Sequence, residues 1–215
     1  MRDKLQKYLE LLTSQNEELN LTAIENPADI WVRHFEDSAQ LLTLFNFTGA
    51  RVLDLGSGAG FPGIPIRLGE PKMRLTLLDA TDKKIEFLRL VCDELELAHV
   101  DCIHGRAEEL ALRNGWRDGF DFVTARGVAR LNILCELALP FLRIGGRLIA
   151  MKENECDDEV GEAKFAIATL KGELEELKRY TLSNGRTHAV VIIRKTDMTP
   201  NGYPRRYARI KTKPL

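Results

Sequence analysis

The sequence predicts an α/β protein built around a mostly parallel sheet, and three observations support this fold class. Short apolar runs, typical of strands buried on both faces, alternate along the chain with segments of helical periodicity. The first run, residues 52–55, leads directly into a loop that contains four glycines. The last two predicted strands flank Ser183-Asn-Gly-Arg186, which is a strong signal for an antiparallel hairpin.

The length of 215 residues predicts one domain with an appendage. We expect a helical extension at 1–48, an α/β core at 49–196 and a basic tail at 197–215. The net charge of −1 is unevenly distributed, because residues 194–215 carry +6 and the remainder carries −7. The basic end is either a tail that binds a polyanion or a solvated segment without a partner, and charge alone favours neither.

The cysteines and histidines form no metal-binding pattern. There is no C-x-x-C motif, and none of the four cysteines stands at zinc spacing from a histidine. The sequence also shows no signal peptide and no apolar run of about 18 residues. We therefore expect a cytoplasmic protein with reduced thiols, no metal and no membrane contact.

Two helices are expected before the first strand. Residues 2–19 place several leucines and Tyr8 largely on one face, and Pro27 is suited to the first turn of the second helix. In that second helix His34 follows the apolar spacing. It is either a buried imidazole with a hydrogen-bond partner or, together with Arg33 and Asp37, part of the border of an active site.

The glycine loop has the spacing G-x-G-x-G-x-x-G, formed by Gly56, Gly58, Gly60 and Gly63. This spacing differs from the dinucleotide motif, and the lysine and Ser/Thr of a phosphate-binding P-loop are absent. Asp54, just before the glycines, would repel a pyrophosphate but attract a cationic amine. The pattern therefore favours S-adenosylmethionine, which carries an ammonium group and a positive sulfonium. The alternative is a tight strand–helix turn without a ligand.

Three further strand ends point to the same ligand. The run at 75–79 ends in Asp79, about 20 residues past the loop, where such folds place the acid that binds ribose hydroxyls. The strand at 100–104 leads to Ala107 and Glu108, which we expect beside the adenine, and the strand at 120–125 leads to Arg126. Ligands bind at the carboxyl ends of the strands in open α/β sheets, so these residues are predicted to form one site.

The remaining elements complete a Rossmann-like architecture. We expect helices at about 81–96, 108–112 and 130–140, then a turn at Gly145-Gly146 into a fifth strand that ends at Lys152. An acidic helix at 157–170 and strands at about 173–182 and 187–194 follow. The total is seven strands, and parallel strands that finish in an antiparallel hairpin fit a class I S-adenosylmethionine-dependent methyltransferase.

Several motifs occur along the chain in a recognisable order. They are Asn20-Leu-Thr22, Arg33-His-Phe-Glu-Asp-Ser38, Leu53-Asp-Leu-Gly-Ser-Gly-Ala-Gly-Phe-Pro-Gly-Ile-Pro65, Thr76-Leu-Leu-Asp79, Lys83-Lys-Ile-Glu-Phe-Leu88, Arg106-Ala-Glu-Glu109, Ala125-Arg126 and the Lys-Pro-Leu ending. Over essentially the whole chain, the sequence closely resembles the RsmG (GidB) family of bacterial 16S ribosomal RNA methyltransferases. The glycine segment with Phe-Pro-Gly-Ile-Pro carries most of the resemblance, because it is far more specific than a generic methyltransferase loop.

The resemblance implies methyl transfer from S-adenosylmethionine to guanine N7 in a conserved loop of the 16S rRNA, with S-adenosylhomocysteine as the spent donor. The implied donor-binding residues are Gly56, Phe61, Ala107, Glu108 and Arg126, to which the strand-end and glycine-loop arguments add Asp54, Gly58 and Asp79. The chain departs from the family pattern at two positions. Gly127 stands where alanine is common, and Glu153 stands where glycine is usual.

Guanine N7 is a bare lone pair, so its methylation needs no general base. We expect Arg126 to line the pocket beside donor and guanine as the catalytic residue. His34, Lys152 and the tail residues Arg205, Arg206 and Arg209 are the expected RNA contacts. Tyr203 and Tyr207, interleaved with these arginines, either stack on bases or anchor the tail to the fold.

The expected partner is the 16S rRNA or the small ribosomal subunit, and no stable protein partner is evident. Two other functions remain open from the sequence. A small-molecule methyltransferase would share the donor site, and a non-catalytic RNA-binding module would bind the donor weakly or not at all. A dinucleotide oxidoreductase is disfavoured by the glycine spacing and by Asp54.

Overall fold

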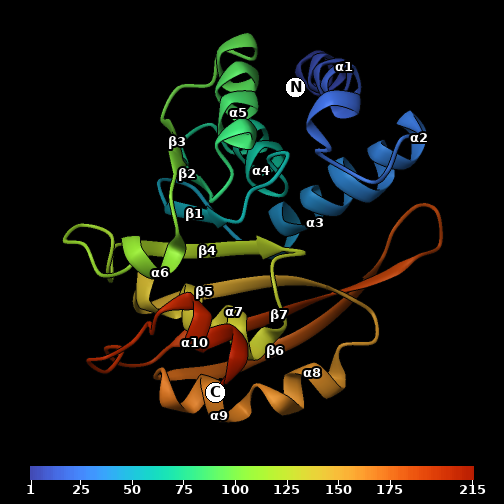
Figure 1. Ribbon diagram of the computed structural model, residues 1–215. Helices are drawn as coiled ribbons and strands as arrows, with labels where there is room; N and C mark the ends of the chain where they lie inside the picture. The colour runs from blue at the N-terminus through green and yellow to red at the C-terminus, as the bar shows by residue number, and fades with distance from the viewer.

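The computed structural model describes all 215 residues and contains one seven-stranded sheet (Figure 1). The strands are β1 (Arg51–Leu55), β2 (Arg74–Asp79), β3 (Val100–His104), β4 (Phe120–Arg126), β5 (Leu142–Glu153), β6 (Gly172–Thr181) and β7 (Thr187–Lys195). Their order across the sheet is β3-β2-β1-β4-β5-β7-β6. The first five are parallel, and β7 is antiparallel to both of its neighbours. The predicted fold class is confirmed.

Helices cover both faces of the sheet (Figure 1). One side carries α1 (Arg2–Leu19), α2 (Pro27–Ile30), the π-helix η1 (Trp31–Glu36), α3 (Asp37–Leu44), α4 (Gly63–Gly69) and α5 (Asp82–Glu94). The other carries α7 (Leu131–Ala138), α8 (Asp157–Glu162), α9 (Lys164–Thr169) and α10 (Tyr207–Thr212). Two short helices, α6 (Ala107–Leu110) and the 3₁₀-helix η2 (Leu139–Phe141), complete the chain. None of the helices combines the length and the apolar composition needed to cross a bilayer.

Two hydrophobic cores lie on the two faces of the sheet, and together they explain the continuous apolar run of β7. In β7, Val190 and Ile192 pack into the core beneath the N-terminal helices, whereas Val191 and Ile193 pack into the core beneath α7 and α9. Since successive side chains of a strand point to opposite faces, a strand buried on both sides reads as a continuous apolar run.

The second N-terminal helix begins at Pro27 as predicted, and it contains a π-helical segment that the sequence did not indicate. The Asn26 side chain caps it by accepting a hydrogen bond of 2.9 Å from the backbone N–H of Ala28, and Pro27 occupies the first turn. The π-helix η1 then joins α2 to α3, and such segments occur frequently at functional sites. This helix carries Arg33, His34 and Asp37 toward the end of β4.

Two expected features differ in the structure. The turn predicted at Gly145-Gly146 is absent, because β5 runs through both glycines and Gly145 adopts a φ of +83° within an irregular stretch where the pairing with β4 shifts register. The glycines therefore accommodate a bulge, not a turn. The acidic helix predicted at 157–170 is divided at Ala163 into α8 and α9.

The C-terminal segment is fastened to the core. Glu136 of α7, fully buried, accepts hydrogen bonds of 2.8 Å from Nε of Arg205 and 2.6 Å from its Nη2. Arg117 donates to the carbonyl oxygens of Thr199 and Tyr203 at 2.7 and 3.0 Å. Ile210 is fully buried in the core on the α7 side. These contacts hold α10 in a fixed place.

Replacement of Arg205 by alanine should destabilise the fold by about 3–5 kcal/mol, because it leaves the carboxylate of Glu136 buried without its cation. Chemical denaturation followed by circular dichroism measures this. The neighbouring Arg206, which is exposed, provides the control: Arg206→Ala should change the unfolding free energy by less than about 0.5 kcal/mol. Equal stabilities of Arg205→Ala and the unmodified protein would contradict the proposed role of the ion pair.

Candidate active site

The glycine loop between β1 and α4 is held in a conformation that requires glycine at two crowded positions. Gly56 has a φ of +68°, and a Cβ there would lie 2.7 Å from Val128. Gly60 has a φ of +97°, and a Cβ there would lie 2.5 Å from the hydroxyl of Tyr8. The Tyr8 hydroxyl also donates a hydrogen bond to the carbonyl of Ala59, so helix α1 holds the glycine loop in place.

Asp54 lies under this loop and is fully buried. Its carboxylate accepts hydrogen bonds from the Thr124 hydroxyl at 2.8 Å and from the Gly63 N–H at 3.2 Å. Burial raises the pKa of Asp54 to about 6, although these hydrogen bonds oppose the rise. The structure thus shows Asp54 supporting the loop, and its contact with the amine of a donor stays a prediction.

A cavity of about 170 Å³ opens at the ends of β1–β4, where the sequence predicted the donor site. Eight of its thirteen lining residues are hydrophobic. The lining consists of Leu55, Gly56, Leu78, Asp79, Ala80, Gly105, Arg106, Ala107, Glu108, Val128, Ala129, Leu137 and Tyr207. Four of the predicted donor-binding residues (Gly56, Asp79, Ala107 and Glu108) therefore gather around one cavity, which we call the donor cavity.

Asp79 connects this cavity to the glycine loop. One carboxylate oxygen accepts a hydrogen bond of 2.9 Å from the N–H of Gly58, and the other accepts one of 2.8 Å from the N–H of Thr81. Each oxygen is left with a further lone pair for a ligand hydroxyl. A Cβ at Gly58 would meet only the Gly56 carbonyl oxygen, at 3.9 Å, so the space above this part of the loop is open.

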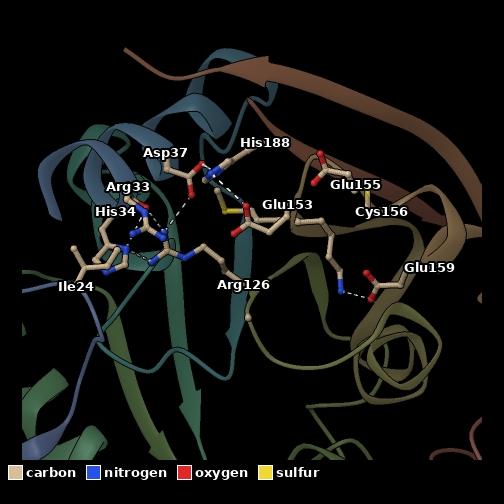
Figure 2. Close-up of a pocket in the computed structure, with 13 residues that line it drawn as sticks. Ile24, Arg33, His34, Asp37, Arg126, Glu153, Glu155, Cys156, Glu159 and His188 are labelled. Carbon is tan, nitrogen blue, oxygen red and sulfur yellow. Dashed lines mark hydrogen bonds and ion pairs between the residues drawn. The ribbon is translucent and has the colours of Figure 1, made fainter. Parts of the chain in front are cut away.

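Arg126, at the end of β4, occupies the centre of a second group of side chains (Figure 2). Its Nη1 donates to the carbonyl oxygen of Arg33 at 3.0 Å and to the carboxylate of Asp37 at 3.2 Å. Its Nη2 donates to Nδ1 of His34 at 3.0 Å. The guanidinium carbon also lies 5.2 Å from the centroid of the Phe61 ring. Four contacts thus fix the orientation of Arg126.

His34 is a neutral acceptor in this arrangement. Burial and the charge of Arg126 lower the pKa of His34 to about 3. Since Arg126 donates to Nδ1, the proton is assigned to Nε2, which lies 2.8 Å from the Thr22 hydroxyl. The ring also stacks on Phe61 with centroids 4.7 Å apart. The imidazole therefore has hydrogen-bond partners inside the protein, and His34 also lines a cavity together with Arg33 and Asp37, so the two interpretations are compatible.

Asp37 is the fixed anion of the group. It is 1% exposed, and besides Arg126 it accepts hydrogen bonds from the Tyr180 hydroxyl at 2.7 Å and from Nδ1 of His188 at 2.9 Å. Tyr180 and His188 face each other across the β6–β7 hairpin. Neither residue belongs to a motif that marks it as a site residue in the sequence. The hairpin signal predicted both strands, but only the correct register places this pair side by side.

A second cavity, of about 340 Å³, lies beside Arg126 (Figure 2). Its lining is mostly polar: Ile24, Arg33, His34, Asp37, Arg126, Gly127, Met151, Lys152, Glu153, Glu155, Cys156, Glu159 and His188. We call it the polar cavity. From the segment that follows β4, residues 128 and 129 contribute to the lining of the donor cavity. The two residues just before them, 126 and 127, contribute to the lining of the polar cavity. The two cavities are therefore neighbours along the segment that follows β4.

Several predicted RNA contacts have partners inside the protein. Lys152 donates to the carbonyl of Ala129 at 2.8 Å and pairs with Glu159 at 2.5 Å, and Arg205 pairs with the buried Glu136. His34 is held as described above. Arg206 and Arg209 are exposed. An RNA role for these five residues stays a prediction, and it is best supported for the two exposed arginines.

Phe61 lies outside the donor cavity. It is 4% exposed and packs against Tyr8, His34 and Phe35, so it supports the Arg126 group and does not line the donor cavity. Its contact with a donor stays a prediction. No group of three or more His, Cys, Asp or Glu side chains is placed to hold a metal ion.

Comparison with solved structures places the fold among methyltransferases. An O-methyltransferase from Bacillus cereus, in complex with SAH, superimposes with a TM-score of 0.62 at 19% identity, covering 88% of this chain and 91% of that one. A SAM-dependent methyltransferase from Aquifex aeolicus gives a TM-score of 0.59 at 15% identity, covering 81% and 96%. At these identities the likeness concerns the fold alone.

Comparison of sequences is more specific. The family model described as rRNA small subunit methyltransferase G matches residues 1–188. Two proteins named ribosomal RNA small subunit methyltransferase G, from Streptococcus gordonii (strain Challis) and Streptococcus suis, are 39% and 40% identical over 216 residues. Each alignment covers 100% of this chain and 91% of the relative. The resemblance found in the sequence is thereby confirmed, and the chain belongs to the rRNA small subunit methyltransferase G family.

Proposed function

We propose that this chain transfers a methyl group from S-adenosylmethionine to N7 of a guanine in a loop of 16S rRNA. The observation that carries the proposal is the pair of adjoining cavities at the end of β4. One is mostly apolar and lined by strand-end acids, and the other is polar and contains the fixed guanidinium of Arg126. A donor and an acceptor held in these two cavities would meet beside residues 126–129.

The residues of the donor cavity fit S-adenosylmethionine, which supplies a methyl group on a positively charged sulfur when it is bound. The open space above Gly58 admits the amino-acid end, and Asp54 beneath the loop is ionised above a pH of about 6. The free lone pairs of Asp79 suit the ribose hydroxyls. Ala107, with the apolar walls around it, suits the adenine.

The polar cavity fits an acceptor that has no proton to lose. Guanine N7 carries a bare lone pair, so the enzyme needs only to hold it in line with the methyl group, about 3–3.5 Å away. His34 is neutral and both of its ring nitrogens are engaged, which suits a positioning role. Arg126, whose orientation is fixed by Asp37 and His34, is the group that we assign to orient the guanine.

The substrate form follows from the position of N7. In A-form RNA, N7 lies in a groove too narrow for side chains, so the target base must come from a loop or be splayed out. Exposed cations on the same molecule, Arg206 and Arg209, are proposed to hold the flanking phosphates. The small ribosomal subunit, or its rRNA, is thus the proposed partner.

Transfer of label from methyl-labelled S-adenosylmethionine to rRNA tests the proposal directly. The substrate is rRNA from cells that lack this protein, supplied both as free RNA and as small subunits. We expect one labelled nucleotide, a loop guanine modified at N7, located by mass mapping. Donor binding without label on any RNA would contradict the proposal and favour a small-molecule acceptor.

Arg126→Ala should lower turnover by about 100-fold and also weaken donor binding, because the guanidinium no longer fixes the junction between the two cavities. Single-turnover methylation and calorimetric titration with S-adenosylhomocysteine measure the two effects. Arg74→Ala, at the exposed opposite end of the sheet, is the matched control. If Arg126→Ala left both donor affinity and turnover unchanged, the role assigned to Arg126 would be wrong.

Removal of Arg206 and Arg209 together should weaken RNA binding and make it less dependent on salt. Each lost phosphate contact lowers the slope of log affinity against log salt by about 0.7 for single-stranded RNA. Filter binding at several salt concentrations measures the slope. The control is Lys72→Ala/Arg74→Ala, which removes two cations from the amino-terminal edge of the sheet. Identical slopes for both double variants would exclude these arginines as phosphate contacts.

A further inference from the structure

The donor cavity has one lining residue that lies far from the strand ends. Eleven of its thirteen residues come from the ends of β1–β4 and the loops that follow them, and Leu137 comes from α7. The thirteenth, Tyr207, is the first residue of α10. The loops of the sheet therefore do not enclose this cavity alone.

Tyr207 stands beside the loop that follows β3. Its ring centroid lies 6.0 Å from the guanidinium carbon of Arg106. Arg106, Glu108 and Tyr207 line the donor cavity on one side and an outer cavity of about 590 Å³ on the other. These three side chains are therefore the wall between the two cavities, and Tyr207 contributes the only aromatic ring of that wall.

The position of this ring is set by contacts on both sides of it. Two residues earlier, Arg205 is tied to the buried Glu136 through its side chain and through its backbone N–H, at 2.8 Å. Three residues later, Ile210 is fully buried. Tyr207 itself is 38% exposed, so its ring is available to a ligand while its backbone is fixed.

We propose that Tyr207 closes the adenine end of the donor site and stacks on the adenine of S-adenosylmethionine. This inference rests on the proposed function for the identity of the donor. The glycine loop after β1 and Asp79 at the end of β2 take the amino-acid and ribose parts, so the residues after β3 face the base, and Tyr207 lies among them. An aromatic ring beside an apolar cavity suits the face of a purine. In this proposal the C-terminal segment contributes to the donor site, in addition to the RNA contacts proposed for Arg206 and Arg209.

Calorimetric titration without RNA tests this, with S-adenosylhomocysteine and with 5′-methylthioadenosine, which keeps the adenosine part and lacks the amino-acid part. Tyr207→Ala should weaken both ligands by a similar factor of about ten, the loss of one stacking contact. Tyr207→Phe should bind within about twofold of the unmodified protein. Tyr207→Leu keeps apolar bulk without the ring and should lose nearly as much as alanine. Lys211→Ala, exposed on the same helix, is the control and should bind normally.

Thermal unfolding of each variant shows whether the fold is retained, and Tyr207→Leu covers the case in which the alanine variant does not fold. Unchanged affinity in Tyr207→Ala and Tyr207→Leu would overturn the inference. A loss for S-adenosylhomocysteine without one for 5′-methylthioadenosine would also overturn it, because the contact would then lie elsewhere. If the unmodified protein bound the donor normally but methylated no RNA, the proposed function would be contradicted and the inference about Tyr207 would not. If the unmodified protein bound neither ligand, both proposals would fall.

Discussion

The carboxylate of Asp37 is almost completely enclosed, and a buried charge is tolerated only when hydrogen-bond donors and an opposite charge surround it. Its partners are Arg126 from β4, Tyr180 from β6 and His188 from β7. Because this one anion must be satisfied, helix α3, which begins at Asp37, is joined to the three strands β4, β6 and β7. It also leaves Arg126 with little freedom, because the same guanidinium is shared with His34 and with the carbonyl of Arg33. The polar cavity takes its shape from this arrangement.

In the proposed function, one cavity holds the methyl donor and the other holds the acceptor. The donor cavity is mostly apolar and presents a few fixed acceptors, as expected for a site that binds a nucleoside by its faces and its hydroxyls. The polar cavity presents charged groups whose orientations are already determined by internal hydrogen bonds. A displacement reaction at a bare nitrogen needs no proton transfer, so holding donor and acceptor in line is a substantial way for the protein to lower the barrier. The buried network is thus consistent with catalysis by positioning.

Much of the fold could be predicted because parallel strands buried on both faces have a clear sequence signal. The run at 52–55 and the loop that follows it were located correctly, and the strand-end argument brought Asp79, Ala107 and Glu108 to one cavity. The π-helical turn at 31–36 was not predictable, since it preserves the composition of an ordinary helix. The pairs Asp37–His188 and Glu136–Arg205 were equally hidden, because tertiary packing chose partners with no local signal. The sequence shows Tyr207 only as one of two tyrosines among basic residues, and nothing in it indicates that this side chain reaches the donor cavity.

The Asp37 network has a further consequence for how the molecule assembles. Asp37 is separated along the chain by 89 residues from Arg126, by 143 from Tyr180 and by 151 from His188. Contacts of such high sequence separation carry a large loop-closure entropy and are slow to form compared with helices and hairpins. We therefore expect a refolding molecule to regain its helical circular dichroism before Arg126 reaches its final orientation. With Arg126 in its proposed role, recovery of methyl transfer would report the completion of the topology, whereas recovery of secondary structure would report an earlier stage of folding.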